Sequence, residues 1–543
     1  MPESSRDRRI DSSEPDSRRP QDAVFVPRVI ATGLTAAAVL SAVGLRWFHL
    51  GKLSLWWDEG FTAWQSGLSP AELLRFARSD TYPPLYFFLQ RYWAALFGNS
   101  EYALRALSAL FGTLSVPVFY LLAKKVLRDG LAVALAMWLF AFSMMQVWYS
   151  REARSYELAS FLALVSLYAL VLFLERRSLL LFASIVLSVA ASLYMHNMMF
   201  FYLLALNVTW LIYPSDRTSA ERLKELLLAD ILAGVLFLPW ASSLLTQIAT
   251  VGGHLWWVSR PTVSNLFQTL SIIAGFDIQY LSWLPSRLMP LSEQTAWVCV
   301  VAGTGFLCAA LVGGGFWRVS TADSNRNLSL LLYCLLPIVV VFVLSQKGQP
   351  LYIERVFTAS SVVAPIVLAY PLALQRGPKG RILYGFLGIV LAATTVLSAF
   401  GFLRYQEKEN WRDATNSLLR IPEENRLIVF VPPAGQILFD YYSQRSSVMD
   451  RGVAKIGLPA NFRIPAPPAR ITGPSDLDGL KLAVESRKYS EIDLVLAHEN
   501  VTDPRGLALD CMNGTFVRYE EQRFYGVRIV RFRASRPGSA IGE

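Results

Sequence analysis

Long apolar runs follow one another between residues 29 and 402 and determine the expected architecture. A helix needs about 20 mainly apolar residues to cross the hydrocarbon core of a membrane. The pattern therefore predicts a mainly α fold, a polytopic membrane bundle of about 11–13 transmembrane helices. The expected spans are 29–48, 101–123, 130–149, 156–174, 178–195, 197–213, 226–247, 294–317, 328–345, 356–374 and 381–402.

The apolar stretch 83–97 differs from these runs because it is short and opens with Pro83 and Pro84. Such a segment favours a helix that lies at the interface or re-enters the membrane without crossing it. When this stretch is left out, the basic residues of five loops share one side of the membrane, which the positive-inside rule makes cytoplasmic. These residues are Lys124, Lys125, Arg128, Arg176, Arg177, Arg217, Arg222, Lys224, Arg318, Arg326, Arg376, Lys379 and Arg381.

This parity predicts a multi-pass protein of the cytoplasmic (inner) membrane with a cytoplasmic amino terminus. Residues 49–100, 150–155, about 248–293, 346–355 and everything after about 403 then face outward. Residues 1–28 hold six arginines and six acidic residues, whose charges cancel, and this composition predicts a disordered cytoplasmic tail.

Beyond Phe402 the composition becomes that of a soluble domain, so residues 29–402 form the expected membrane domain and 403–543 a periplasmic or extracellular one. Two short apolar runs and one alternating run predict strands, and two segments between them predict helices. We therefore expect a small α/β domain. The strands are 427–431, 493–496 and 527–532, the helices are 414–419 and 436–442, and a Pro-rich linker is expected near 464–474.

Composition supports the membrane assignment, since 53% of the 543 residues are hydrophobic and only 17% are charged, with a mean hydropathy of +0.37. Soluble domains carry about a quarter charged residues. The net charge of +10 reflects the basic loops, so we expect no nucleic-acid partner. Four cysteines, three of them within expected spans, give no disulfide framework. The sequence also lacks a Walker loop and a zinc-type cluster, which argues against an ATP-driven pump.

The motif with the clearest chemical meaning is Trp56-Trp57-Asp58-Glu59-Gly60, directly after the first span. Tryptophan is enriched at the membrane–water interface, so the pair places Asp58 and Glu59 at the membrane surface. A carboxylate at that depth can act as a general base while a lipid-linked substrate reaches it from the bilayer. The acids could equally be two solvated residues of a loop.

Other outward-facing segments carry ionisable or aromatic residues at the same expected depth. Taken singly, the arginines could be interface anchors that snorkel to the headgroups, and the histidines are more typical of hydrogen-bonded structural residues than of metal ligands. Their joint occurrence beside Asp58 is what favours a functional site. The residues are Arg151, Arg154 and Arg355, together with Tyr82, Tyr86, Tyr156, His196 and His254.

Sugar transfer from a polyprenyl phosphate needs these parts. The leaving group is a phosphate, for which arginine offers a permanent charge and forked donors, and the attacking hydroxyl needs a carboxylate within hydrogen-bond reach. Because the donor carries one phosphate, no cofactor is obligatory, and the sequence does not support a divalent metal. The main alternative is a lipid-linked-sugar translocase or transporter without transfer chemistry, and a non-catalytic scaffold is a third reading. Transporters place charged groups near the bilayer midplane, whereas these lie at the outer ends of spans.

At these residues the chain resembles the GT-C superfamily of integral-membrane glycosyltransferases. It is most similar to bacterial relatives of the protein O-mannosyltransferases (glycosyltransferase family 39), with the lipid A aminoarabinose transferases as cousins. The resemblance covers roughly residues 30–440. The matching stretches are Trp57-Asp58-Glu59, Pro83-Pro84-Leu85-Tyr86 running to Phe97-Gly98 and Arg105, Tyr149 to Tyr156, Met195-His196-Asn197, Leu238-Pro239-Trp240, Glu354-Arg355 and Trp411-Arg412-Asp413.

The resemblance implies a GT-C bundle that transfers a sugar, of hexose, pentose or uronic acid type, with inversion. The donor would be a polyprenyl-phosphate-linked sugar, and the acceptor an envelope lipid, polysaccharide or protein on the outer face of the membrane. By position, Asp58 would be the general base with Glu59 supporting it. The donor phosphate would bind Arg151, Arg154 and Arg355, and substrate would contact Tyr82, Tyr86, Tyr156, His196 and His254.

The chain departs from its relatives at two positions. Relatives often have histidine where this chain has Tyr82, which weakens a metal-site analogy with the aminoarabinose transferases. Relatives commonly have tyrosine or leucine after the late arginine, where this chain has Val356, and this puts the role of Arg355 in question.

Overall fold

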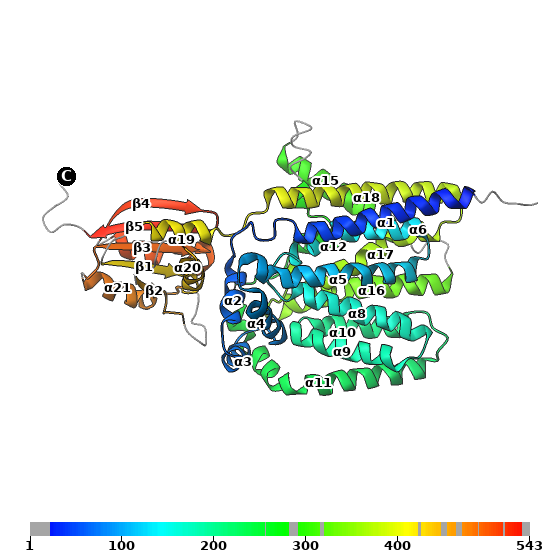
Figure 1. Ribbon diagram of the computed structural model, residues 1–543, viewed down its shortest axis with the longest axis horizontal. Coiled ribbons are helices and arrows are strands. Elements are labelled where there is room, and N and C mark those ends of the chain that lie inside the picture. Colours follow the sequence, from blue (N-terminus) through cyan, green and yellow to red (C-terminus); the bar gives the residue numbers. More distant parts are fainter. Residues whose placement is uncertain are drawn as a thin grey trace, which may run out of the picture.

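A computed structural model describes most of the chain and shows a helical bundle with a small sheet domain at one end (Figure 1). The described residues are 22–255, 257–281, 292–314, 320–421, 425–446, 453–462, 470–486, 488–513 and 516–534. Most of the predicted tail 1–28 and of the predicted linker 464–474 lies outside these residues.

The bundle contains a helix at every expected span. Among the described residues, seven helices are long and apolar enough to cross a membrane, and further apolar helices of 10–17 residues accompany them. The protein is therefore a multi-pass membrane protein. The bundle helices are α1 (Asp22–Trp47), α5 (Glu101–Leu127), α6 (Gly130–Phe142), α7 (Met144–Tyr149), α8 (Tyr156–Glu175), α9 (Leu179–Met195), α10 (Met199–Ile212), α11 (Ser219–His254), α15 (Glu293–Gly314), α16 (Thr321–Lys347), α17 (Thr358–Leu374) and α18 (Pro378–Tyr405).

One expected span, 130–149, is broken into α6 and α7 at Ser143, whose ψ of 114° is not helical. The Met144 N–H leaves the helical pattern and donates to the Gly275 carbonyl at 3.3 Å. Gly275 belongs to the segment after α11 that also forms α12 (Val263–Ile273) and α13 (Ile278–Leu281). A backbone group within the bundle needs such a partner, so the break depends on this neighbouring segment.

The loop between α1 and α5 forms three short helices at the end of the bundle that faces the sheet domain (Figure 1). They are α2 (Trp57–Ser66), α3 (Pro70–Ser79) and α4 (Leu85–Phe97). Helix α3 begins with a capping box between Ser69 and Glu72 and has Pro70 at its first position. Helix α4 corresponds to the short apolar stretch and, with 13 residues, is too short to be a span.

Ion pairs between loops show which loops lie together, and they form two groups at opposite ends of the bundle. At one end Arg381 pairs with Asp129 at 2.9 Å and Arg177 with Glu221 at 3.0 Å, so the predicted basic loops lie together. At the other end the loop between α1 and α5 meets residues from 150–155, 346–355 and the segment after α18. The predicted grouping of loops is thus present, while the prediction that the basic end is cytoplasmic stays a prediction.

The residues after α18 form a sheet of five strands in the order β2-β1-β3-β5-β4. β1 (Arg426–Val431) pairs in parallel with β2 (Ala454–Gly457) and β3 (Glu491–Ala497), whereas β5 (Val527–Ala534) is antiparallel to β3 and β4 (Phe516–Phe524). β1 and β3 are buried along their whole length because helices cover the sheet. These helices are α19 (Trp411–Leu419), α20 (Gly435–Ser443), α21 (Asp478–Glu485), α22 (Glu499–Thr502) and α23 (Leu507–Asn513).

The predicted α/β domain is therefore present, with its three expected strands at β1, β3 and β5 and its two expected helices at α19 and α20. β2 and β4 were not expected. β4 is a largely exposed edge strand that contains polar and charged residues along most of its length, so its pattern gives little hydrophobic signal. β2 has only four residues.

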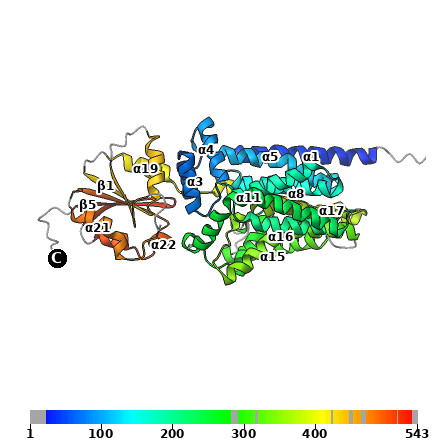
Figure 2. The ribbon, with the colours of Figure 1, turned by 90° about the horizontal axis from the view of Figure 1, so that it is seen from below.

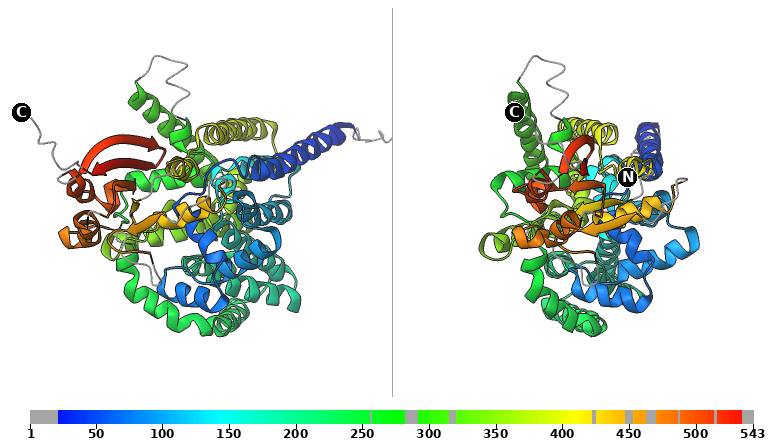
Figure 3. Two further views of the ribbon diagram at one scale, coloured as in Figure 1. Left: turned by 60° about the vertical axis from the view of Figure 1, so that its left-hand side comes forward. Right: turned by 90° about the vertical axis from the view of Figure 1, so that its left-hand side faces the viewer.

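The sheet domain packs against α2 and its neighbours, as two perpendicular views show (Figures 1 and 2). Tyr442 on α20 accepts a hydrogen bond from the Leu55 N–H at 2.7 Å. A Cβ atom at Gly60 would lie 2.6 Å from the Leu438 side chain of α20, so any larger residue would force this side chain or the two helices to shift. The views from the side of the sheet domain show α2 and α4 behind it (Figure 3). The domain and the first loop thus share a hydrophobic core.

Candidate active site

Helix α2 places two adjacent carboxylates in its first turn, where the helix dipole favours negative charge. The two side chains point into different environments. Asp58 is 18% exposed at the end of the bundle that faces the sheet domain, whereas Glu59 is completely buried. The Trp57 N–H at the start of the helix donates to Glu409, a residue that leads into the sheet domain.

Glu59 forms a buried bidentate pair with Arg105 of α5, at 2.8 Å from Nε and 2.6 Å from Nη2. The remaining donors of Arg105 bind the carbonyls of Leu50, Leu53 and Ser54. Burial alone would raise the pKa of Glu59, but the charges of Arg105 and Lys408 lower it to about 2. Glu59 is therefore a permanently charged residue that fixes the loop before α2 against α5.

Lys408 extends this ionic cluster to the segment between α7 and α8. Its Nζ lies 3.2 Å from Glu59 and 3.2 Å from Glu152, and Glu152 also accepts a hydrogen bond from Trp148 Nε1 at 2.7 Å. The Ala153 N–H donates to Glu59 as well, at 3.1 Å. Three segments far apart in the chain are thereby held around one buried carboxylate.

Asp58 pairs with Arg355, whose Nη1 lies 2.8 Å from Oδ2. Arg154 reaches the same residue from the segment between α7 and α8 and donates to its main-chain carbonyl at 3.4 Å. Burial favours the neutral acid, but the charges of Arg355, Arg154 and His498 lower the pKa of Asp58 below its usual value. Asp58 is thus an ionised carboxylate between two arginines.

Aromatic rings surround the two arginines. Arg154 lies 4.6 Å from the ring centre of Tyr82, and Arg355 lies between 5.7 and 5.9 Å from the rings of Trp56, Tyr156 and Trp257. The hydroxyls of Tyr82 and Tyr156 are 2.9 Å apart, which joins the loop between α1 and α5 to the start of α8. Rings at this distance stabilise a guanidinium and keep water away from it.

The ring of His196 packs against both tyrosines, with its centre 5.1 Å from that of Tyr82 and 5.5 Å from that of Tyr156. Its Nδ1 accepts a hydrogen bond from the Met198 N–H at 3.1 Å. Burial, together with the charges of Arg154 and Arg355, lowers the pKa of His196 to about 3, so the ring is neutral. With Nδ1 as an acceptor, the proton is assigned to Nε2, which has no partner among the described residues.

The arginines also hold buried donors that no described residue satisfies. The Nε atoms of both Arg154 and Arg355 are buried and have no hydrogen-bond partner in the described part of the chain. Buried donors are almost always paired in folded proteins, so unpaired ones indicate a place for a ligand or water. Two guanidinium groups and a neutral imidazole together can bind an anion with oxygen acceptors.

The structure brings six of the predicted site residues into this cluster, namely Asp58, Arg154, Arg355, Tyr82, Tyr156 and His196. Glu59 lies beside it as an ionic anchor. Arg151 instead donates to the Leu45 carbonyl at 3.2 Å, and no described contact links it to Asp58. Tyr86 is completely buried in the hydrophobic core below the site. The side chain of His254, the last residue of α11, lies outside the described part of the structure.

His498, Glu409 and Lys408 were not predicted as site residues. His498 follows β3 in a left-handed conformation with φ of 52°, and its Nε2 lies 2.8 Å from Glu409. Its ring also contacts Trp57 edge-on at 5.5 Å. A Cβ at Gly526 would lie 2.7 Å from Glu409 Cγ, so the β4–β5 turn approaches the same place. No local pattern marks these residues, because their partners are distant in sequence.

Metal-ligating side chains do not gather at the site. Among the described residues, no group of three or more His, Cys, Asp or Glu side chains is placed to hold a metal ion. The positive charge beside Asp58 comes from arginine side chains, which can neutralise a phosphate without a metal ion.

Comparisons with known proteins point to one enzyme class over part of the chain. Residues 81–242 match the family described as dolichyl-phosphate-mannose-protein mannosyltransferase, which confirms the resemblance to protein O-mannosyltransferases for these residues. A sequence search of curated proteins gives no significant match.

Solved structures of similar architecture share little sequence with the chain. The oligosaccharyltransferase of Archaeoglobus fulgidus, in complex with zinc and sulfate, is 13% identical with a TM-score of 0.48, over 92% of this chain and 72% of that one. ArnT from Cupriavidus metallidurans has a TM-score of 0.43 both in the apo state, at 12% identity, and bound to undecaprenyl phosphate, at 14%. Each ArnT comparison covers 92% of this chain and 98% of that chain.

Proposed function

We propose that the protein is an inverting glycosyltransferase that takes a sugar from a polyprenyl-phosphate donor and passes it to an envelope acceptor. The observation that carries the proposal is the pair of buried arginines beside Asp58, whose Nε–H groups have no partner among the described residues. The match to a family that uses a dolichyl-phosphate sugar supports the donor class.

In this proposal Arg154 and Arg355 bind the phosphate of the donor. Their unpaired Nε–H groups offer hydrogen bonds to phosphate oxygens, and the surrounding rings lower the local dielectric. The N–H at His196 Nε2 is a further neutral donor, beside the rings of Tyr82 and Tyr156. The leaving phosphate gains negative charge as the sugar departs, so these donors bind the transition state more tightly than the substrate.

Asp58 acts as the general base. The acceptor oxygen forms a bond to the anomeric carbon, its proton passes to the Asp58 carboxylate, and the bond from that carbon to the phosphate oxygen breaks. The electrons of the broken bond remain on the phosphate, which Arg154 and Arg355 neutralise. Attack from the side opposite the phosphate inverts the anomeric configuration.

The ion pair between Asp58 and Arg355 gives the donor a way to activate the base. Without substrate, Arg355 holds the pKa of Asp58 low, and such a carboxylate is a weak base. A phosphate that draws Arg355 to itself removes part of this stabilisation. The pKa of Asp58 then rises, and the acid becomes a stronger base only when the donor is bound.

An apolar cavity supplies a place for the isoprenoid chain. It has a volume of about 340 Å³ and lies between α12, α15, α16 and α17, with no charged residue among its lining side chains. A polyprenyl chain is wholly apolar and would remain in contact with such a surface. Representative lining residues are Phe267, Leu270, Ile273, Leu331 and Val367.

The proposal places the reaction on the outer face of the cytoplasmic membrane. It combines the predicted orientation with the position of the site, which lies at the end of the bundle away from the basic loops. The carboxyl-terminal domain then lies outside the membrane and covers the site. The acceptor is an envelope lipid, polysaccharide or protein that reaches Asp58 from this side.

The test compares envelope lipids and glycans by mass spectrometry in cells with the wild-type gene, with the gene deleted and with Asp58→Asn. We expect one glycan or lipid to lose a single sugar mass in both altered strains, while the polyprenyl-phosphate sugar accumulates. A translocase would behave differently, because Asp58→Asn would then leave the product intact. Identical envelopes in all three strains would contradict the proposal.

A further inference from the structure

The indole N–H of Trp56 is buried and has no hydrogen-bond partner in the part of the chain that the structure describes. Trp56 is the residue directly before α2, in an extended conformation with φ of −95° and ψ of 176°. The centre of its ring lies 5.9 Å from the guanidinium carbon of Arg355. The mechanism above uses this ring only as part of the aromatic surroundings of Arg355 and gives its polar atom no role.

Hydrogen bonds of the backbone on either side hold Trp56 in this place. The Leu55 N–H donates to Tyr442 of the sheet domain at 2.7 Å. The Trp57 N–H donates to Glu409 at 3.2 Å. The chain before α2 is therefore fixed by contacts with later segments, and these contacts also fix the position of the indole.

The indole needs an acceptor that the protein does not provide. A tryptophan side chain has one polar atom, and this atom can only donate a hydrogen bond. Tryptophans at a membrane interface usually satisfy the N–H in the wet part of the interface. Nε1 of Trp56 is closed off from solvent, which removes that partner. Buried donors are almost always paired in folded proteins, so this atom indicates a place for an acceptor that arrives with a ligand.

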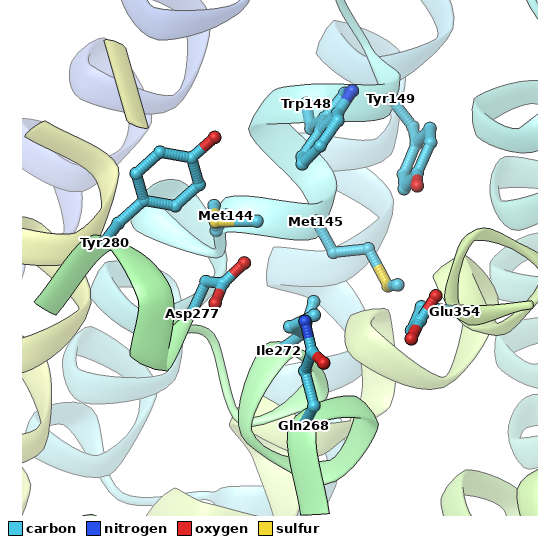
Figure 4. Close-up of a pocket in the computed structure, with 9 residues that line it drawn as sticks. All are labelled: Met144, Met145, Trp148, Tyr149, Gln268, Ile272, Asp277, Tyr280 and Glu354. Carbon is cyan, nitrogen blue, oxygen red and sulfur yellow. The ribbon is translucent and has the colours of Figure 1, made fainter. Parts of the chain in front are cut away.

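A polar cavity beside the site does not supply this acceptor. It has a volume of about 140 Å³, which is enough for ordered water, and it is lined in part by Tyr149 and Glu354 (Figure 4). Glu354 directly precedes Arg355 in the chain, yet Trp56 is not among the residues that line the cavity. Water held in this cavity therefore has no contact with the indole N–H.

Four buried N–H donors of the site lack a partner among the described residues, and they come from four separate segments of the chain. Donors without acceptors indicate a ligand that is rich in oxygen, and the two guanidinium groups among them favour one with negative charge. A phosphate that links a lipid to a sugar has two free oxygens and gains a third when the sugar leaves. The four atoms are Nε of Arg154, Nε of Arg355, Nε2 of His196 and Nε1 of Trp56.

We infer that Trp56 is a further residue that binds the donor, with its indole N–H donating to an oxygen of the lipid phosphate beside Arg355. The inference rests on the proposed function, since that function places the phosphate at the two arginines. Trp56 lies two residues before Asp58, so one short piece of chain carries both a ligand of the leaving group and the general base. The phosphate gains charge as the sugar departs, so this hydrogen bond stabilises the transition state more than the bound donor.

The test replaces Trp56 by 3-benzothienylalanine, an isostere in which a sulfur atom takes the place of the N–H while the ring keeps its size and shape. Trp56→Phe is a second, simpler variant. Binding of polyprenyl phosphate is measured on the full-length protein in lipid nanodiscs. We expect both variants to bind it roughly ten- to a hundredfold more weakly, the loss of one hydrogen bond to a charged group, and the isostere to keep the wild-type unfolding temperature. Unchanged affinity of the isostere would overturn the inference.

Trp210 offers a matched control. Its Nε1 is also buried without a partner among the described residues, but it lies in the last turn of α10, whereas His196 precedes the first turn of that helix. The same two replacements at Trp210 should leave the affinity for polyprenyl phosphate at the wild-type value. An equal loss at both positions would assign the effect to packing and contradict the role of Trp56.

Three lipids identify the group that the Trp56 N–H meets. They are polyprenyl phosphate, a polyprenyl-phosphate hexose and the uncharged polyprenol. The isostere should weaken binding of the first two by the same factor and leave binding of polyprenol unchanged. A loss confined to the hexose would give the N–H to the sugar, and a loss shared by polyprenol would give the effect to packing against the isoprenoid chain. Either result would exclude a hydrogen bond to the phosphate.

Transfer assays on the same proteins separate this inference from the proposed function. If the wild type transfers a sugar and the isostere binds polyprenyl phosphate normally, only the role of Trp56 is wrong. If the expected binding pattern appears without any transfer, only the proposed function is contradicted. Where both hold, the turnover rate at saturating donor should also fall in the isostere, because the hydrogen bond strengthens as the sugar leaves.

Discussion

His498, at the end of β3, contacts Glu409 in the segment that connects the sheet with the bundle, with 2.8 Å between Nε2 and Oε1. Glu409 also accepts hydrogen bonds from the Trp57 N–H and from Trp411 Nε1. One carboxylate therefore links β3, the first turn of α2 and α19. The position of Asp58 depends on a domain that comes 350 residues later, as the contact between residues 57 and 409 shows.

The His498–Glu409 contact makes the docking of the sheet domain sensitive to pH. The hydrogen bond to Glu409 raises the pKa of His498 above its usual 6.5, although partial burial opposes this. Stabilisation from a raised histidine pKa is complete below 6.5 and is lost as the pH rises through the folded value. We expect the thermal unfolding midpoint of the wild type to fall as the pH rises above 6.5, and to change less in His498→Gln. An equal slope in both proteins would assign the pH dependence to other groups.

Asp58 and Glu59 should fail in different ways when their charges are removed. Asp58→Asn should reduce transfer by about 10²–10⁴-fold, the usual contribution of a general base, with little change in unfolding temperature. Glu59→Gln leaves Arg105 and Lys408 without their buried counterion, which typically costs about 3–5 kcal/mol of stability. Thermal unfolding and transfer rates of both purified variants separate the two roles. Loss of transfer in Glu59→Gln at unchanged stability would instead give the chemistry to Glu59.

Arg154 and Arg355 should not tolerate lysine. A lysine keeps the charge but lacks the forked donors, and losing one hydrogen bond to a charged group should weaken donor binding by roughly ten- to a hundredfold. Binding of polyprenyl phosphate to purified Arg154→Lys and Arg355→Lys measures the effect. Arg151→Lys is a matched control, because this nearby residue bonds to the Leu45 carbonyl. Equal donor affinity in all three variants would contradict the phosphate site.

Gly60 should be intolerant of even the smallest side chain. Gly60→Ala places a methyl group against Leu438, so this side chain or the two helices must shift. Over-packing of this kind typically costs about 1–3 kcal/mol. We expect a lower unfolding temperature and faster protease cleavage near the junction after α18. The double variant Gly60→Ala with Leu438→Ala should recover part of the loss, and failure to recover would point to another cause.

Membrane orientation can be tested with single cysteines in a background that lacks the four native ones. Leu482→Cys lies on α21 with 70% of the residue exposed, and Arg176→Cys lies in an exposed basic loop at the other end. A membrane-impermeant thiol reagent added to intact cells should label position 482 and leave position 176 unlabelled. The reverse pattern would place the site on the cytoplasmic side.

The sequence predicted the elements of the bundle well because each apolar run carries its own signal. The pair Asp58 and Glu59 was predicted as a site for the same reason, since two acids after two tryptophans form a local motif. The structural roles of Glu59 and Lys408 could not be predicted from the sequence, because they depend on contacts between residues that are far apart in the chain. Lys408 looks like an ordinary charged residue at the end of a span, yet it is almost completely buried against Glu59 and Glu152.

The break at Ser143 was missed for a related reason. Residues 130–149 are apolar throughout, so no local signal separates α6 from α7. The carbonyl of Gly275 accepts the N–H that the break releases, and this residue comes from a loop more than a hundred positions later. The sequence around Ser143 therefore gives no sign of the helix break, because the break depends on packing against Gly275.

Lys408 and Glu409 come late in the chain, so they also determine when the buried ionic cluster of a newly made protein can assemble. Translation proceeds from the amino terminus, so the ribosome has made Asp58, Arg154 and most of the bundle before these two residues emerge. Until then Glu59 lacks one of its two cationic partners and the start of α2 lacks its acceptor. An unfinished or prematurely terminated protein therefore carries an unassembled centre. Biosynthesis itself delays the assembly of this centre until the sheet domain has folded onto the bundle.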